Sequence, residues 1–303
     1  MKIPRLITAL VVLLSASACN AVASPSPQWK PSKSDADITA IGHRRIVRGT
    51  NFYSLDKEKA LGDQLAKQVE RSTKFVDDLA ITGYVDRVGQ KLARNSDAEM
   101  PVTFFVLDRD SVSSFTLPGG RQYVSRGLLL QLEGEAELAG VLAHGIAHTA
   151  LRAATKEATQ GVITQIAGIP VFTPNGAPVP AGNTPLQAGA MLTLLKVERE
   201  DVLAADYFGL QYVYKTGYDP ECFVLLTERG GWPAVSPGKT VPKELSPFPP
   251  VGERLKAMRK EMAEILPKRS DAIVSTPEFK DFQERVRAWK PGHSESKQPD
   301  EKH

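Results

Sequence analysis

The feature that most constrains this chain is the segment GVLAHGIAHTALR at residues 140–152, where two histidines stand four apart in an apolar, alanine-rich run. Four residues advance an α-helix by just over one turn, so His144 and His148 share one face of the helix that this run predicts. Two imidazoles on one face are a common start for a zinc site. The residue after His144 is Gly145, which has no side chain to act on a metal-bound water. The pattern predicts either an incomplete metal site or two buried histidines hydrogen-bonded to their neighbours.

The N-terminus, MKIPRLITALVVLLSASAC, joins a basic start to an apolar run and small residues. This pattern is typical of a secretory signal, because the apolar run is too short to span a membrane. Two interpretations of its end stay open. Residues 16–19 resemble a bacterial lipoprotein box that would place a lipid anchor on Cys19, whereas residues 21–23 suit ordinary signal peptidase. Both predict a periplasmic protein, attached to a membrane in the first case.

The charge balance argues against nucleic acid as a partner. Lysine and arginine number 38 and aspartate and glutamate 35, which gives a formal net charge of +3. Lys2 and Arg5 lie in the predicted signal, so the remaining charge is 3 − 2 = +1. A chain so close to neutral has no strong electrostatic attraction to a phosphate backbone.

The two cysteines, Cys19 and Cys222, predict no disulfide. If Cys19 is lipidated or removed, Cys222 has no partner, and its apolar surroundings, PECFVLL, predict a buried thiol.

Apolar periodicity predicts a mostly helical domain at residues 51–289, after a signal at 1–23 and a flexible tether at 24–50. A disordered tail is expected at 290–303. A glycine- and proline-rich loop at 170–185 is either a lid or an insertion. The expected helices lie at about 54–71, 77–93, 134–152, 187–215, 217–228, 246–262 and 276–289, and the expected strands at 102–107 and 121–125, with a turn at 118–120.

Four segments together resemble the HtpX and CAAX-prenyl-protease family of zinc metallopeptidases, in particular its soluble periplasmic, BepA-like branch. They are SSFTLPGGRQYVSRGLL, GEAELAGVLAHGIAHTALR, AADYFGLQYVYKTGYDP and SPFPPVGERLKAM. The resemblance implies an α+β, mostly helical, zincin-like fold with a small antiparallel sheet packed on the HxxxH helix. It also implies zinc as cofactor and metalloendopeptidase activity, with His144 and His148 as two metal ligands.

The chain departs from the family pattern at three polar positions. The family has a glutamate as general base where this chain has Gly145, and general acid–base catalysis contributes typically about 10²–10⁴-fold. With Asp206 and Gly209 fixing the register, the third metal ligand falls on Val202. A histidine near the family's active site is replaced by Phe248.

Some residues around the predicted site have two interpretations. Glu198 precedes Val202 by one turn and is a candidate substitute ligand, or else part of a solvated helix face. Asp206 supports the metal site in the family; here the favoured interpretation is a simple hydrogen bond to a histidine or to backbone. Arg254 keeps its family position in the segment after the proline pair.

The stretch from Leu117 to Val124 is a candidate peptide-binding edge, since an extended substrate pairs with a strand beside the metal helix in gluzincin-like sites. Leu117, Gly119, Gly120 and Tyr123 are the candidate residues. The alternative is an ordinary strand preceded by a turn.

The sequence therefore predicts a periplasmic metallopeptidase-like protein that is catalytically inactive, holds zinc weakly or not at all, and binds envelope proteins or extended peptides. The alternative is an active zinc metalloendopeptidase with a non-standard ligand set that degrades misfolded envelope proteins.

Overall fold

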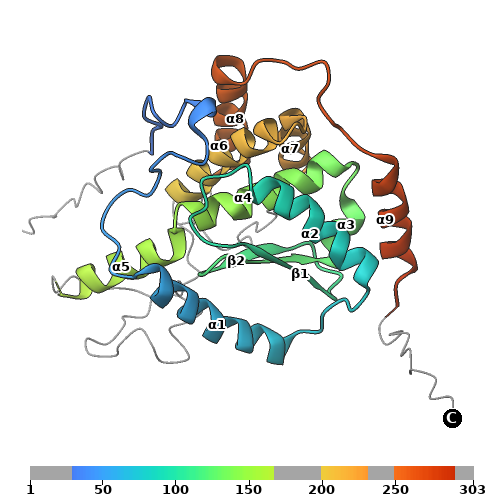
Figure 1. Cartoon of the computed structure of the whole chain (residues 1–303), viewed down its shortest axis with the longest axis horizontal. Helices are drawn as coiled ribbons and strands as arrows, with labels where there is room; N and C mark the ends of the chain where they lie inside the picture. Colours follow the sequence, from blue (N-terminus) through green and yellow to red (C-terminus); the bar gives the residue numbers. More distant parts are fainter. Residues whose placement is uncertain (1–28, 167–198, 231–248, 291–303) are drawn as a thin grey trace, which may run out of the picture.

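The computed structural model describes residues 29–166, 199–230 and 249–290 (Figure 1). In this part of the chain a small sheet is surrounded by helices, as the predicted α+β class requires. The elements are η1 (Ile38–Ala40), α1 (Leu55–Ser72), α2 (Leu79–Ala93), β1 (Thr103–Leu107), β2 (Ser114–Leu117), β3 (Arg121–Ser125), α3 (Arg126–Gln131), α4 (Glu135–Ala150), α5 (Ala153–Ile166), α6 (Arg199–Lys215), α7 (Pro220–Glu228), α8 (Val251–Ile265) and α9 (Pro277–Ala288).

The sheet lies between α1 on one side and α2 and α4 on the other (Figure 1). Side chains alternate between the two faces of a strand. Phe105, Phe115 and Tyr123 stack with one another on one face, with ring centroids 4.9–5.0 Å from Tyr123, and join a buried cluster with Leu61 and Leu65 of α1. The opposite face packs against α4 and α2, so both faces of the sheet lie inside the protein.

The sheet is mixed, which corrects the predicted antiparallel arrangement for one of its pairs. The strand order is β1-β3-β2. β2 and β3 form the expected antiparallel hairpin, but β1 pairs with β3 in parallel, with Thr103 opposite Arg121. The reason is the connection at 108–113, which takes the chain past the central position to the far edge before it returns as β3. Strand direction thus follows from a crossover that strand composition does not encode.

The turn between β2 and β3 requires its glycines. Gly119 and Gly120 have φ values of 79° and 80°, a conformation that only glycine adopts easily. A Cβ on Gly120 would lie 2.3 Å from the carbonyl oxygen of Pro101. These residues therefore form the predicted turn and are closely packed.

Helix α4 is the centre of the molecule, buried at every position except His148. It packs against α2, α6, α7 and the sheet. Its first residue, Glu135, accepts hydrogen bonds from the hydroxyls of Tyr84, Tyr218 and Thr276. A carboxylate at this end also interacts favourably with the helix dipole. The histidines are thus carried by the most enclosed helix of the fold.

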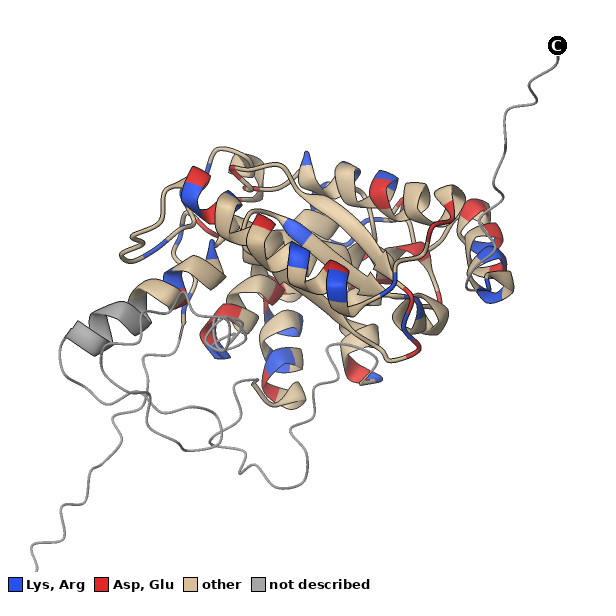
Figure 2. Ribbon diagram, turned by 90° about the horizontal axis from the view of Figure 1, so that it is seen from below, with Lys and Arg blue, Asp and Glu red and all other residues tan. Residues whose placement is uncertain are grey.

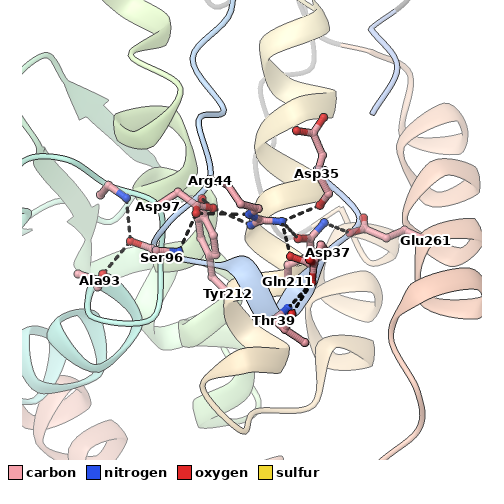
Figure 3. Close-up of polar contacts among 12 residues, drawn as sticks. Asp35, Asp37, Thr39, Arg44, Ala93, Ser96, Asp97, Gln211, Tyr212 and Glu261 are labelled. Atoms are coloured by element: carbon pink, nitrogen blue, oxygen red, sulfur yellow. Dashed lines mark hydrogen bonds and ion pairs between the residues drawn. The ribbon is translucent and has the colours of Figure 1, made fainter. Parts of the chain in front are cut away.

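Residues 29–50 differ from the predicted tether, because they pack on the domain (Figure 3). Ile41 and Ile46 join the core. Arg44, with a side chain only 3% exposed, pairs with Asp97 at 2.6 Å and donates to Gln211 of α6 at 2.6 Å. The charged residues of this segment predicted a solvated tether. In the structure Arg44 is instead buried, because Asp97 and Gln211 compensate its charge.

Several predictions lie outside the described residues: the signal with Cys19, the loop at 170–185, Glu198, Phe248 and the tail from residue 291. Within the described residues, no helix combines the length and apolar character needed to cross a membrane. Basic and acidic residues are interspersed over the described ribbon (Figure 2).

Candidate functional site

His144 and His148 turn their Nε2 atoms toward each other, 3.0 Å apart, from adjacent turns of α4. Two nitrogens bound to one zinc at 2.0–2.1 Å in tetrahedral geometry would lie about 3.3 Å apart. The two rings therefore converge as two ligands of one metal do. His144 is 4% exposed, whereas His148 is the one residue of α4 that is partly exposed.

Asp206 and Arg254 lie next to Nδ1 of His144, the ring nitrogen that does not face His148. Oδ1 of Asp206 lies 2.9 Å from Nδ1 of His144, and both carboxylate oxygens accept from the Arg254 guanidinium at 2.7 Å. Burial alone would raise the pKa of Asp206, but Arg254 and then His144 outweigh it and lower the pKa to about 2. The structure thus places Asp206 in contact with a histidine, which both interpretations of this residue allow. A carboxylate–imidazole contact of this kind is also what orients a metal ligand.

Burial lowers the pKa of both imidazoles, most strongly that of His148, and Asp206 offsets only part of the effect at His144. Both rings are therefore neutral near neutral pH. Because Nδ1 of His144 faces a carboxylate, it carries the proton and leaves Nε2 as an acceptor. His148 then donates from its own Nε2, and the two rings satisfy each other's polar atoms.

The space beside Gly145 is taken by Gln122 of β3. A Cβ at position 145 would lie 2.2 Å from Nε2 of Gln122 and 2.3 Å from its Cδ. Gln122 is fully buried and donates to the carbonyl oxygen of Val141 at 3.1 Å. Its Oε1 is buried with no hydrogen-bond partner among the described residues. The general-base position is thus both empty of a carboxylate and closed by a neutral amide.

The third-ligand position, Val202, is 1% exposed and lies on α6 one turn before Asp206. Residues four apart share a helix face, so Val202 faces α4 as Asp206 does. In residues 29–166, 199–230 and 249–290, no three histidine, cysteine, aspartate or glutamate side chains gather as a metal site. The described residues therefore fit zinc only in part: two nitrogens converge and valine stands where the third donor belongs.

The structure places the four candidate peptide-binding residues in different environments. Tyr123 lies in the central strand, bonded on both sides, and its side chain is buried against α1. Gly119 and Gly120 form the turn under α1 and beside Pro101. Leu117 ends β2 and is buried. Of these, Leu117 alone belongs to an edge strand of the described sheet.

The edge strand beside α4 is β2, and two residues that the sequence did not single out form its outer side. Ser125 N–H donates to the Ser113 carbonyl, so alternation along the ladder turns the backbone groups of Phe115 and Leu117 toward β3. Those of Ser114 and Thr116 point away from β3. The Thr116 hydroxyl lies 3.5 Å from the Gly145 carbonyl, which places this edge next to the histidine helix.

Gln122 was also missed, although the sequence carries a signal for it. In RQYVS the alternation puts Gln122 on the same face as Val124, opposite Tyr123. This alternation indicates that Gln122 lies on an inward face of the strand. Its contact with Gly145 is known only from the structure.

Comparison with known proteins agrees with this geometry. The family model described as Peptidase family M48 matches residues 80–262, which is more than half of the chain. The Beta-barrel assembly-enhancing protease of Yersinia pestis is 27% identical over 176 residues, covering 55% of this chain and 36% of that protein. Its namesake in Escherichia coli strain K12 is 24% identical over 184 residues, covering 58% and 38%. The Mitochondrial metalloendopeptidase OMA1 of Schizosaccharomyces pombe is 28% identical over 199 residues, covering 64% and 57%.

A helix with two converging histidines, an aspartate–arginine pair behind them and an edge strand beside them define a zincin-type metallopeptidase scaffold. The chain belongs to peptidase family M48, and its branch is that of the beta-barrel assembly-enhancing proteases. The predicted family is confirmed. The chain spans less than two thirds of the length of these relatives.

Proposed function

We propose that this chain is a catalytically inactive member of the family that holds extended segments of envelope proteins. The observation that carries the proposal is the amide of Gln122 in the space beside Gly145. An amide does not take a proton from water at neutral pH, so it cannot replace the glutamate of a working site. Its bulk also excludes any other base from that position.

The donor set supports the same proposal for the metal. His144 and His148 supply two nitrogens, and Val202 supplies no donor. A catalytic zinc site needs three protein ligands and one open position. We therefore propose that zinc is held weakly or not at all.

The edge of β2 supports peptide binding. An extended peptide adds to a sheet edge through main-chain hydrogen bonds, and Ser114 and Thr116 present their N–H and C=O groups there. This function requires neither a base nor a metal. The predicted signal and the names of the bacterial relatives favour the periplasm as location and envelope proteins as ligands, with Cys19 as a lipid attachment site in the lipoprotein interpretation.

The first test measures zinc in the purified full chain after dialysis against a weak chelator, with casein cleavage assayed alongside. We expect clearly substoichiometric zinc and no chelator-sensitive cleavage. Stoichiometric zinc with chelator-sensitive cleavage would establish the active metalloendopeptidase instead, an alternative that the converging Nε2 atoms and Asp206 favour.

A restored variant makes this test sharper. The triple variant Gly145→Glu, Gln122→Val, Val202→Glu supplies the missing base and ligand and removes the blocking amide. We expect it to retain zinc and to cleave casein. The double variant that keeps Gln122 is the matched control, and we expect it to bind zinc without comparable cleavage, because the amide displaces the new glutamate.

Peptide binding is tested separately with a fluorescently labelled, unstructured segment of an outer-membrane protein. Thr116→Pro removes the outward N–H, and proline is tolerated on edge strands, so we expect affinity to fall about tenfold. Thr116→Val keeps that N–H and should bind nearly as the wild type does. Equal binding by all three proteins would exclude the β2 edge as the binding surface.

A further inference from the structure

A pocket of about 220 Å³ lies between the N-terminal segment, α6 and α8. Its apolar walls come from Trp29, Leu203, Tyr207 and Met258, and the carboxyl of Glu261 also lines it. Pockets for drug-sized ligands measure about 300–1,000 Å³. This one is therefore suited to a single amino-acid side chain.

Two aromatic rings form part of the wall. Trp29 packs edge-on against Tyr207, with centroids 5.2 Å apart, and against Phe208 at 6.1 Å. These contacts fix the position of Trp29 on α6. Aromatic rings attract cations, most strongly in the case of tryptophan.

Glu261 is the acidic group in this pocket that has no cationic partner among the described residues. It is 5% exposed, and its Oε1 accepts from Nε2 of Gln211 at 3.1 Å (Figure 3). Its Oε2 has no hydrogen bond from the described residues. Burial raises the pKa of Glu261 well above its ordinary value, although Gln211 acts in the opposite direction. A bound ammonium would therefore have to displace this proton and restore the carboxylate.

The other charges around the pocket already have partners. Both oxygens of Asp206 are held by Arg254. Lys260 pairs with Glu264 at 3.8 Å, both well exposed at the rim. Arg44, which lies beyond Gln211, is paired with Asp97. A ligand with one positive charge would therefore complete the set.

We propose that this pocket binds a primary ammonium on an aliphatic stem, as in the lysine side chain of a polypeptide. Lysine places its methylene stem against apolar surface and its charge at the end. This matches apolar walls and three acidic residues, of which Asp206 and Glu264 already pair with a cation and Glu261 does not. A guanidinium prefers two carboxylate oxygens, and Gln211 occupies one of them. The pocket therefore selects lysine over arginine.

The test uses the full chain and Nα-acetyl-lysine methylamide as probe, with affinity measured by ligand-observed NMR titration. The norleucine counterpart has the stem without the charge, and we expect it to bind about tenfold or more weakly. The arginine counterpart should also bind more weakly than lysine. Pentylamine has the stem and the ammonium without the amide groups. If it binds as tightly as the lysine probe, the result supports the proposal and shows that the stem and the ammonium alone are recognised.

Variants locate the binding. Glu261→Gln keeps shape and removes the charge, so lysine affinity should fall about tenfold, whereas Glu264→Gln at the rim should change it less than about twofold. Absence of saturable binding, equal affinity for lysine and norleucine, or unchanged affinity in Glu261→Gln would overturn the proposal. If Glu261→Gln fails to fold, the comparison of probes on the wild type decides. None of these measurements depends on zinc, cleavage or the β2 edge.

Discussion

The two sides of the histidine helix differ in what they retain. On the side of α6 and α8, Asp206 and Arg254 form a buried ion pair that contacts His144. On the side of the sheet, Gly145 and Gln122 pack without any acid. Asp206 and Arg254, which are present, also stabilise the interior of the protein. Position 145, where a carboxylate would serve catalysis only, is a glycine. The family scaffold therefore persists here around a site that lacks the carboxylate of the general base.

The largest expected effect on stability comes from breaking the buried ion pair on the side of α6 and α8. Arg254→Met leaves the Asp206 carboxylate buried without its cation, which costs about 3–5 kcal/mol of unfolding free energy. Urea unfolding measures it. The matched control is Arg269→Met, which breaks an exposed pair with Asp271 and should leave the free energy of unfolding almost unchanged. A loss of similar size in both variants would show that the buried pair has no special structural role.

The second prediction concerns the closed side. Glycine to alanine inside a helix normally stabilises by about 0.5–1 kcal/mol, as we expect for Gly83→Ala on α2, where a Cβ meets nothing within 4 Å. Gly145→Ala should instead destabilise by about 1–3 kcal/mol, because the enclosed Gln122 amide has to move and lose its bond to Val141.

A double-mutant cycle checks the cause. In a Gln122→Ala background, Gly145→Ala should become neutral or stabilising. If it destabilises by the same amount in both backgrounds, Gln122 is not what closes the position.

The smallest expected effect is a pH dependence of the free energy of unfolding, which arises from Glu261 on the side of α6 and α8. The raised pKa of Glu261 means that the folded state holds a proton that the unfolded state releases above its ordinary pKa. Stability then falls as pH rises through that window. Asp206 strengthens the shift, and Gln211 and Arg44 oppose it. Glu261→Gln removes the titration, so its stability relative to wild type should increase as the pH rises above the ordinary glutamate pKa of 4.5.

Urea unfolding of both proteins at several pH values measures this difference. The exposed Glu264→Gln variant should show no such trend. A constant difference between wild type and Glu261→Gln would mean that Glu261 titrates alike in the folded and unfolded protein.

The sequence was sufficient for the family, the histidine helix and the β2–β3 hairpin, because apolar periodicity and a Pro-Gly-Gly turn are local signals. It did not predict the parallel pairing of β1, which depends on a crossover. Nor did it predict the packing of residues 29–50, since the Asp97 that pairs with Arg44 lies 53 residues away. The blocking role of Gln122 needed the distance between a strand and a helix.

The packing of residues 29–50 on the domain also limits how far the domain could lie from a lipid attached to Cys19. If Cys19 carries a lipid, the nine residues 20–28 are all that separate the membrane surface from the packed chain. Fully extended, they reach about 30 Å. A freely hanging tether to residue 50 would have allowed roughly three times that height. The domain would then be confined to a thin layer next to the bilayer.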